Sequence, residues 1–369
     1  MTTAARALFL ALAVVVTACG VPVGQAGAGP ALSISVSGDH FVNQDGQTVV
    51  LRGINTSGSE FACVKEGTIF DGSEQASAGS ISAMRSWGFN AVRVQLNESC
   101  WLGIQRVAPA VSGQAYRSAI ELYVHALVEA GMYVIVDLHW SSKGGGRAAK
   151  GQEPMPDERY APELWRSVAT AFKSDPAVLF DLFNEPYPNR NSGTAAAWQC
   201  ELEGTAGGAC RGIPYQTAGM QQLVDVVRAA QSTNVILVGG PQYAQNLSGW
   251  AQYEPHDPAH QLAASVHIYW GTPTHPDVTE CSASSCWSSV LAPLATQVPV
   301  VVGEFGEFDC GDSLYPPFLT FADHHGISYL GWAWFVGSCS SFPSMIANYA
   351  GTPTAFGAGY RAHLSALGG

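Results

Sequence analysis

Eight short apolar runs recur along the chain about every forty residues, and this repeat limits its possible folds more than any other feature. Each run is rich in β-branched or aromatic residues, as buried parallel strands are. Segments with the helical spacing of apolar residues lie between them. The predicted strands cover residues 49–54, 91–96, 133–138, 178–183, 235–238, 263–268, 298–302 and 328–333. The predicted helices cover residues 80–87, 115–130, 161–174, 216–231, 287–297 and 317–325.

Eight consecutive βα units without a sustained break in composition predict an α/β fold, a single (β/α)8 TIM barrel. An open doubly wound sheet is the alternative, but no glycine-rich dinucleotide loop follows the first strand. Residues 33–50 predict a small β-hairpin ahead of that strand. Residues 33–369 are therefore expected to form one domain.

The N-terminal segment has the features of an export signal. Arg6 is its only charge, and the apolar run 7–18 is too short to span a bilayer permanently. The run ends in Val16-Thr17-Ala18-Cys19, which resembles a bacterial lipobox, in which the cysteine is lipidated. We therefore expect a lipoprotein-type signal peptide at 1–18, a flexible tether at 19–32, and a membrane anchor only through Cys19. Ordinary signal cleavage after residues 26–28 and free secretion remain the alternative.

Eight further cysteines, an even number in an exported chain, predict four disulfides. Sequence alone permits 105 connectivities. The expected pairs are the local Cys200–Cys210 and Cys281–Cys286 and, by elimination, Cys63–Cys100 and Cys310–Cys339. Every one of these cysteines follows a predicted strand, so the bridges should fasten the loops at the carboxyl ends of the strands.

Two glutamates follow predicted strands, Glu185 after the fourth and Glu304 after the seventh. Paired acids at the carboxyl ends of parallel strands suit hydrolysis of a glycosidic bond, because one protonates the leaving oxygen while the other attacks the sugar. A formal charge of −12 argues against nucleic acid, whose phosphates would be repelled. A neutral polysaccharide or oligosaccharide fits better.

Seven motifs, in order along the strands, carry a resemblance to a known family. They are Leu51-Arg52-Gly53-Ile54-Asn55, Val92-Arg93-Val94, Asp137-Leu138-His139-Trp140, Asn184-Glu185-Pro186, His267-Ile268-Tyr269, Gly303-Glu304-Phe305-Gly306 and Gly331-Trp332-Ala333-Trp334. With them the chain resembles glycoside hydrolase family 5, the cellulase-type retaining β-glycosidases, from about residue 49 to residue 364.

The resemblance implies roles for the two acids and their neighbours. Glu185 matches the general acid/base and Glu304 the nucleophile, and Arg93 and Tyr269 match residues that donate hydrogen bonds to the nucleophile. A retaining enzyme of this kind needs its carboxyl groups about 5–5.5 Å apart, whereas an inverting one separates them by about 6.5–9.5 Å. We expect the shorter separation.

The resemblance also implies a sugar-binding set. Asn184 matches the residue that holds the 2-hydroxyl, His139 and His267 match the cleft histidines, and Trp332 matches the stacking platform. Strand alternation places Trp334 on the same face as Trp332, which leaves their assignment open. Three further tryptophans that follow strands are candidates for extending the groove: Trp101, Trp140 and Trp270.

Together these features predict an exported, retaining β-glucan hydrolase, with endo-β-1,4-glucanase as the first choice. A β-mannanase or exo-β-glycosidase of the same family is the rival within the class, and a non-catalytic polysaccharide-binding lipoprotein is the rival outside it. No metal is expected, because the His-x-His of metal-dependent amidohydrolases is absent from strand one. No cofactor is implied, and we expect a monomer.

Overall fold

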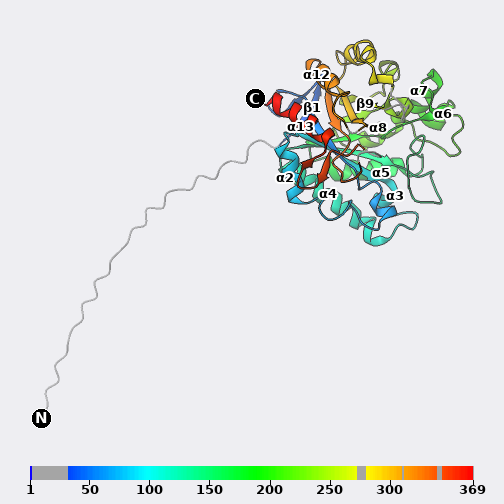
Figure 1. Cartoon of the computed structure of the whole chain (residues 1–369). Helices are drawn as coiled ribbons and strands as arrows, with labels where there is room; N and C mark the ends of the chain where they lie inside the picture. Colours follow the sequence, from blue (N-terminus) through cyan, green and yellow to red (C-terminus); the bar gives the residue numbers. More distant parts are fainter. Residues whose placement is uncertain (2–31, 272–279, 310, 339–342, 369) are drawn as a thin grey trace. The chain divides into compact units, whose positions relative to one another are not determined.

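The chain is built around a closed barrel of eight parallel strands, which confirms the (β/α)8 prediction (Figure 1). The computed structural model describes residues 1, 32–271, 280–309, 311–338 and 343–368. The strands follow one another round the barrel in sequence order, and the last pairs with the first. They are β4 (Arg52–Thr56), β5 (Ala91–Asn97), β6 (Tyr133–Trp140), β7 (Val178–Asp181), β8 (Ile236–Val238), β9 (Leu262–Trp270), β10 (Val300–Glu307) and β11 (Ser328–Gly331).

Each predicted run overlaps one barrel strand, and the boundaries differ for identifiable reasons. The first strand begins at Arg52, because Thr48–Val49 forms β3 and pairs with β2 (His40–Asn43) instead. With β1 (Ile34–Ser37) these strands make a three-stranded antiparallel sheet, one strand more than the expected hairpin. β7 and β11 each end two residues early, where the chain leaves the barrel to form loops.

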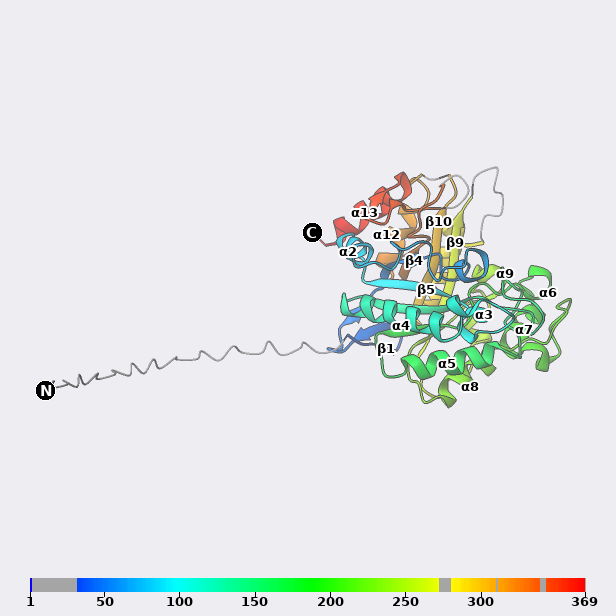
Figure 2. The same cartoon turned by 90° about the horizontal axis from the view of Figure 1, so that it is seen from below.

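Helices cover the outside of the barrel, with α5 and α8 side by side (Figure 2). The helices are α1 (Ala62–Lys65), α2 (Ala78–Ser86), α3 (Glu98–Leu102), α4 (Gln114–Glu129), α5 (Ala161–Phe172), α6 (Pro188–Asn191), α7 (Ala195–Glu203), α8 (Met220–Ala229), α9 (Pro241–Ala244), α10 (Ser284–Cys286), α11 (Ala292–Leu294), α12 (Pro316–His324) and α13 (Ala355–Leu367). Short 3-10 turns cover Pro109–Val111, Gly204–Gly207, Trp250–Gln252 and Glu280–Ser282. A π-helical turn covers Trp287–Leu291, and β12 (Ile346–Asn348) pairs with β13 (Thr352–Pro353).

Five of the six predicted helices are α-helices in the structure, and one of these five starts late; the segment predicted at 287–297 is a π-helical turn followed by the short α11. α4 buries Tyr116, Ile120, Tyr123, Val124 and Leu127 on one face, at the helical spacing seen in the sequence. The helix predicted from residue 216 begins at position 220, because residues 216–218 first run along the loop after β6 and pair with it through backbone hydrogen bonds.

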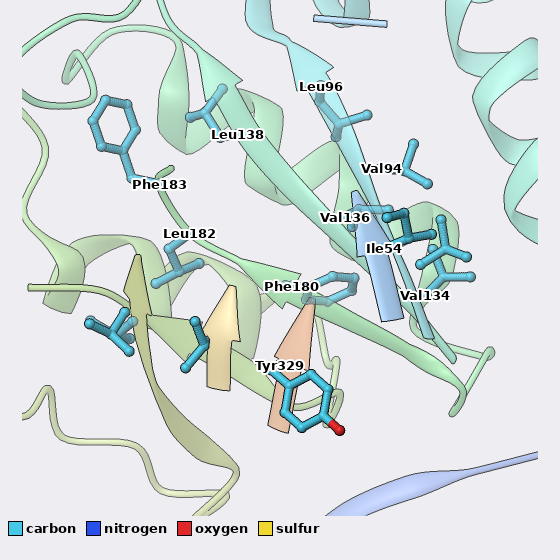
Figure 3. Packing of buried hydrophobic residues seen from close by; sticks show 14 of the residues in the cluster. Ile54, Val94, Leu96, Val134, Val136, Leu138, Phe180, Leu182, Phe183 and Tyr329 are labelled. Atoms are coloured by element: carbon cyan, nitrogen blue, oxygen red, sulfur yellow. The ribbon is translucent and has the colours of Figure 1, made fainter. Parts of the chain in front are cut away.

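Alternation along the strands divides the barrel into an outer apolar layer and an inner face. Figure 3 shows Val94, Val134 and Val136 packed together in the outer layer, where the helices cover them. The inward-facing residues change along each strand. Near the strand starts they are apolar and join Phe41 and Leu51 in a second core, whereas near the strand ends they are polar or ionisable. The polar inward residues therefore gather at the carboxyl end of the barrel.

Three disulfides lie in the described part of the chain: Cys63–Cys100, Cys200–Cys210 and Cys281–Cys286. These pairings match the prediction, and all six cysteines lie beyond the carboxyl ends of strands. Cys19, Cys310 and Cys339, and with them the fourth expected bridge, lie outside the described residues. No described helix is both long and apolar enough to cross a membrane.

Glu201 of α7 provides a test of how pH acts on this fold. Its side chain is 2% exposed, its Oε2 atom has no hydrogen-bond partner among the described residues, and burial raises the pKa of the carboxyl well above its usual range. The folded state therefore keeps the proton to higher pH than the unfolded state. The protonated carboxyl makes its full contribution to the free energy of unfolding below the unfolded-state pKa of about 4.3. This contribution is lost as pH rises through the folded-state pKa.

The variant Glu201→Gln should not lose stability as pH rises, because its buried amide does not ionise. We expect chemical denaturation to give similar unfolding free energies for variant and wild type near pH 4, and a variant more stable by about 1 kcal/mol or more at pH 9, where the wild type must ionise a buried group. Glu203→Gln, an exposed position two residues on, is the matched control and should change little. A Glu201→Gln effect that is equal at both pH values would contradict the explanation.

Candidate active site

Glu185 and Glu304 face each other at the carboxyl end of the barrel. Glu185 lies four residues beyond the end of β7, and Glu304 lies within β10. One oxygen of each carboxyl group lies within 4.8 Å of the other and of a ring nitrogen of His267. The two acids are therefore close neighbours at the mouth of the barrel, and the carboxyl separation of about 5–5.5 Å expected of a retaining pair stays a prediction.

Glu304 is buried and is held by two short hydrogen bonds. Arg93 Nη1 donates to its Oε1 at 2.7 Å, and the Tyr269 hydroxyl donates to its Oε2 at 2.6 Å. Burial raises the pKa of Tyr269 well above its usual range, so the phenol keeps the proton that it donates. These two donors stabilise a negative charge on Glu304 and fix its direction.

Arg93 is the central cation of the site. It is fully buried, and besides Glu304 it pairs with Asp181 at 2.9 Å and with Asp137 at 3.1 Å. Burial, opposed by the arginine charge, raises the pKa of each aspartate to about 7. The guanidinium also donates to the side-chain oxygens of Asn55, at 3.1 Å, and Asn184, at 3.0 Å. Because Lys has neither the planar fork nor five donors, only Arg can make this set of contacts.

His267 lies between the two acids. Its Nδ1 is 2.9 Å from Glu185 Oε1 and 3.6 Å from Glu304 Oε2. Burial lowers the pKa of the ring to about 3, so the histidine is neutral at ordinary pH and can donate only from the nitrogen that carries its proton. With the proton on Nδ1, it donates to Glu185. Gly303 leaves the room for this ring, since a Cβ there would lie 3.2 Å from His267 Nε2.

Glu185 is the acid more open to the cleft. Its side chain is 16% exposed, and Gln152 Nε2 donates to its Oε2 at 2.6 Å. Burial nevertheless raises the pKa of the Glu185 carboxyl above its usual range, although the Gln152 hydrogen bond opposes the shift. A raised pKa favours the protonated form that a general acid requires.

The remaining predicted residues line the same cleft, a cavity of about 350 Å³. Asn184 turns its oxygen to Arg93, which leaves its amide nitrogen as the donor for a ligand. His139 binds Asp137 at 2.8 Å through Nδ1 and stacks on Trp332, with ring centroids 5.3 Å apart and planes 7° from parallel. Burial lowers the pKa of His139, so this stacked ring is held in its neutral form.

The tryptophans are now distinguished by their surroundings. Trp332 lines the cleft, whereas Trp334 is fully buried, donates to Ser80 Oγ and packs against Trp87. Of the three proposed groove residues, Trp101 and Trp270 are buried in the core, so the expectation is wrong for them. Trp140 remains partly exposed, with the Lys65 Nζ atom 4.3 Å from its ring centroid.

Sequence reasoning missed several residues of the site. Gln152, Tyr243, Gln245 and Phe308 line the cleft. Tyr243 lies in the one-turn helix α9, the other three lie outside regular elements, and none of the four matches a motif. Asp181 supports Arg93 from β7. The sequence alone could have identified Asp181, because an aspartate on the inward face of a buried strand needs a charged partner.

Glu185, His267 and Glu304 also offer three atoms that could bind a cation. In this structure the two carboxylates already accept hydrogen bonds from Arg93, Tyr269 and Gln152. A metal would have to displace these donors, whereas hydrolysis by acid and nucleophile uses each of them in place.

The site and fold can be compared with known proteins. The chain is 27% identical over 318 residues to endoglucanase C of Evansella cellulosilytica, and 27% identical over 316 residues to an endoglucanase of a Bacillus species. Each match covers 79% of this chain, but only 34% and 29% of the respective relative. The chain thus spans about a third of the length of these relatives.

Among solved structures, the β-glucanase SdGluc5_26A of Saccharophagus degradans has the same fold, with a TM-score of 0.65 at 21% identity over 91% of this chain and 94% of that one. The family model for cellulase (glycosyl hydrolase family 5) matches residues 42–338. This match covers most of the chain, including every motif named above, and the chain belongs to glycosyl hydrolase family 5.

Proposed function

We propose that this protein is an endo-β-1,4-glucanase that hydrolyses its substrate with retention of configuration. The observation that carries the proposal is the pair Glu185 and Glu304, whose carboxylate oxygens approach within 4.8 Å at the open end of the barrel. This spacing lets a sugar carbon contact one acid while its glycosidic oxygen contacts the other. Endoglucanase relatives and a neighbour crystallised with cellotetraose support a β-glucan as the substrate.

In the first step, Glu304 attacks the anomeric carbon while Glu185 donates its proton to the departing glycosidic oxygen. The bond to the leaving sugar breaks, and a covalent glycosyl ester forms on Glu304. In the second step, Glu185, now ionised, accepts a proton from water, and the water oxygen displaces Glu304. Two inversions at the same carbon restore the original configuration, and both acids return to their starting states.

The neighbours of the acids serve these steps. Arg93 and Tyr269 stabilise the negative charge that returns to Glu304 when the ester is hydrolysed. Asn184 is placed to donate to a sugar hydroxyl, an interaction that strengthens as positive charge develops on the ring. The Trp332 indole, supported from behind by His139, provides a flat apolar surface for a sugar ring.

A substrate panel tests the proposal against its rivals. We expect the purified protein to shorten soluble cellulosic chains rapidly, with a fall in viscosity that precedes release of small sugars, and to leave β-mannan largely intact. Products analysed by NMR immediately after cleavage should carry the β-anomer. Preferential cleavage of mannan, release of single units from chain ends, or α-anomeric products would each overturn part of the proposal, and binding without turnover would favour the non-catalytic alternative.

We further propose that residues 1–18 direct export, that residues 19–32 act as a tether, and that Cys19 carries a lipid anchor. The support is the apolar run that ends at Val16-Thr17-Ala18-Cys19. Two acyl chains would hold the enzyme stably at a membrane surface, where one chain would bind only marginally. Mass spectrometry of the native N-terminus tests this, since an unmodified chain that begins near residue 29 would mean ordinary secretion. We also propose that the catalytic domain acts as a monomer, which its mass in solution would test.

A further inference from the structure

A second cavity, of about 1070 Å³, lies beside the loop that follows β6 and is unusually basic. Its lining includes four cations and one acid: Arg106, Lys143, Arg147, Lys150 and Glu153. The whole chain has only 17 lysines and arginines against 29 acidic residues, so almost a quarter of its cations line this one space. A concentration of positive charge on an acidic protein indicates a local function instead of a general surface property.

Most of this charge is not neutralised within the protein. Lys143 pairs with Glu153 at 3.5 Å. In the described parts of the chain, the side chains of Arg106, Arg147 and Lys150 have neither an ion pair nor a hydrogen bond, and all three are exposed. Three cations thus face the cavity with their donors available for a ligand.

The backbone of the loop is held in place under these cations. Asn97 Nδ2 donates to the Ala149 carbonyl at 2.9 Å, and the Ala149 amide donates to Ser99 Oγ at 2.8 Å. Ser99 and Asn97 lie one and three residues before Cys100, whose disulfide partner Cys63 lines the cavity. The loop is therefore fixed to the end of β5 at the point where its charged side chains line the cavity.

The basic cavity and the catalytic cleft share a wall. Gly151 and Glu153 line the basic cavity, whereas Gln152 between them lines the cleft and donates to Glu185. Consecutive Cα atoms are about 3.8 Å apart, so at this point a single segment of the loop's main chain separates the basic cavity from the catalytic cleft. A ligand in the basic cavity therefore lies next to a sugar chain in the cleft.

We propose that the basic cavity binds carboxylate groups carried by the polysaccharide whose main chain occupies the cleft, and that the enzyme therefore prefers acidic β-glucans. The inference rests on the proposed glucanase function. Arg and Lys pair with carboxylates, and Arg does so with two parallel hydrogen bonds. The concave shape and the wall shared with the cleft favour a substituted sugar chain over a lipid surface, which would need cations on an outward face.

The test compares two soluble glucans of matched chain length, neutral hydroxyethyl cellulose and carboxymethyl cellulose. In the triple variant Arg106→Gln/Arg147→Gln/Lys150→Gln, the ratio of kcat/KM on the acidic glucan to that on the neutral one should fall about 10-fold at low salt, because three exposed ion pairs are lost. The loss should appear in KM, since the contacts act equally in ground and transition states. Arg166→Gln on the outer helix α5 is the control and should leave the ratio unchanged.

Salt and a binding assay complete the test. The acidic preference of the wild type should shrink towards 1 M salt, where the Debye length is about 3 Å. Gel retardation by each glucan, measured in the inactive Glu304→Gln protein, reports binding without turnover. Retardation by the acidic glucan that the triple substitution abolishes would uphold the cavity's role even if no glucan were cleaved.

Two results would overturn the inference. An acidic-to-neutral ratio that the triple variant keeps, in a protein that cleaves both glucans, would refute it while leaving the glucanase function intact. Sedimentation with phosphatidylglycerol vesicles that the triple variant loses, with that ratio unchanged, would assign the cations to a membrane surface instead.

Discussion

Glu304→Gln is expected to reduce turnover of every substrate by about 10⁴-fold or more, as loss of a covalent nucleophile does in other hydrolases. The amide is nearly isosteric with the carboxylate, but it is neutral and cannot form the glycosyl ester. It keeps an oxygen for the Arg93 Nη1 donor, and Arg93 retains its pairing with Asp137 and Asp181. The fold should therefore survive, and the loss should be chemical. Steady-state rates on cellooligosaccharides measure the loss of catalysis, and thermal unfolding of the same variant measures the stability of its fold.

Glu307→Gln provides a matched control in the same strand. Glu307 is fully buried, and its carboxyl accepts hydrogen bonds from the Ser313 and Leu314 backbone amides, away from the cleft. This variant should lose stability while it keeps the chemistry. Substantial activity in Glu304→Gln, or an equal loss of activity in Glu307→Gln, would show that Glu304 is not the nucleophile.

Glu185→Ala is expected to separate the two chemical steps by substrate. On natural glucans, where the leaving oxygen needs a proton, turnover should fall about 10³-fold, within the range that general acids contribute. A dinitrophenyl cellobioside has a leaving group that needs no proton, so its first step should be nearly normal and the ester on Glu304 should accumulate. A burst of dinitrophenol followed by slow turnover is the measurement.

Azide then tests for the missing base. The small anion fits the space left by the side chain beside Gln152 and His267, and it attacks the ester without needing deprotonation. Azide should accelerate turnover of the dinitrophenyl substrate and yield the β-glycosyl azide. The same addition to Glu304→Gln should yield no β-azide, because no ester forms there. An α-azide from Glu185→Ala, or no acceleration at all, would argue against its role as acid and base.

The barrel could be predicted because its strands carry their own signal. Val178–Asp181 and Val300–Glu307 are buried on both faces and read as apolar runs, and helices such as α4 show the 3.6-residue period. α13 was not predicted, because Gly357 and Gly359 lower its helix propensity. It forms because tertiary contacts stabilise it, including the hydrogen bond that Tyr360 donates to the Gly53 carbonyl.

Within the site, strand alternation correctly predicted the direction of a side chain only where the residue lies inside a strand. Arg93 and Asp137 lie inside their strands, and both point inward as the period requires. Alternation also placed Trp332 and Trp334 on one face, but β11 ends at Gly331, so the rule no longer applies and the two rings separate. Gln152 reaches Glu185 from an irregular loop, and only a three-dimensional structure can identify such a contact.

Arg93 and Glu304 touch, although 211 residues separate them in the chain. During synthesis the N-terminal part emerges first, so Arg93, its aspartates and Glu185 all exist before the nucleophile does. These side chains lack the nucleophile Glu304 until β10 takes its place in the barrel between β9 and β11. Activity therefore arises in one step, when the ring of strands closes, and a chain truncated ahead of Val300 would be inert however well the rest had folded.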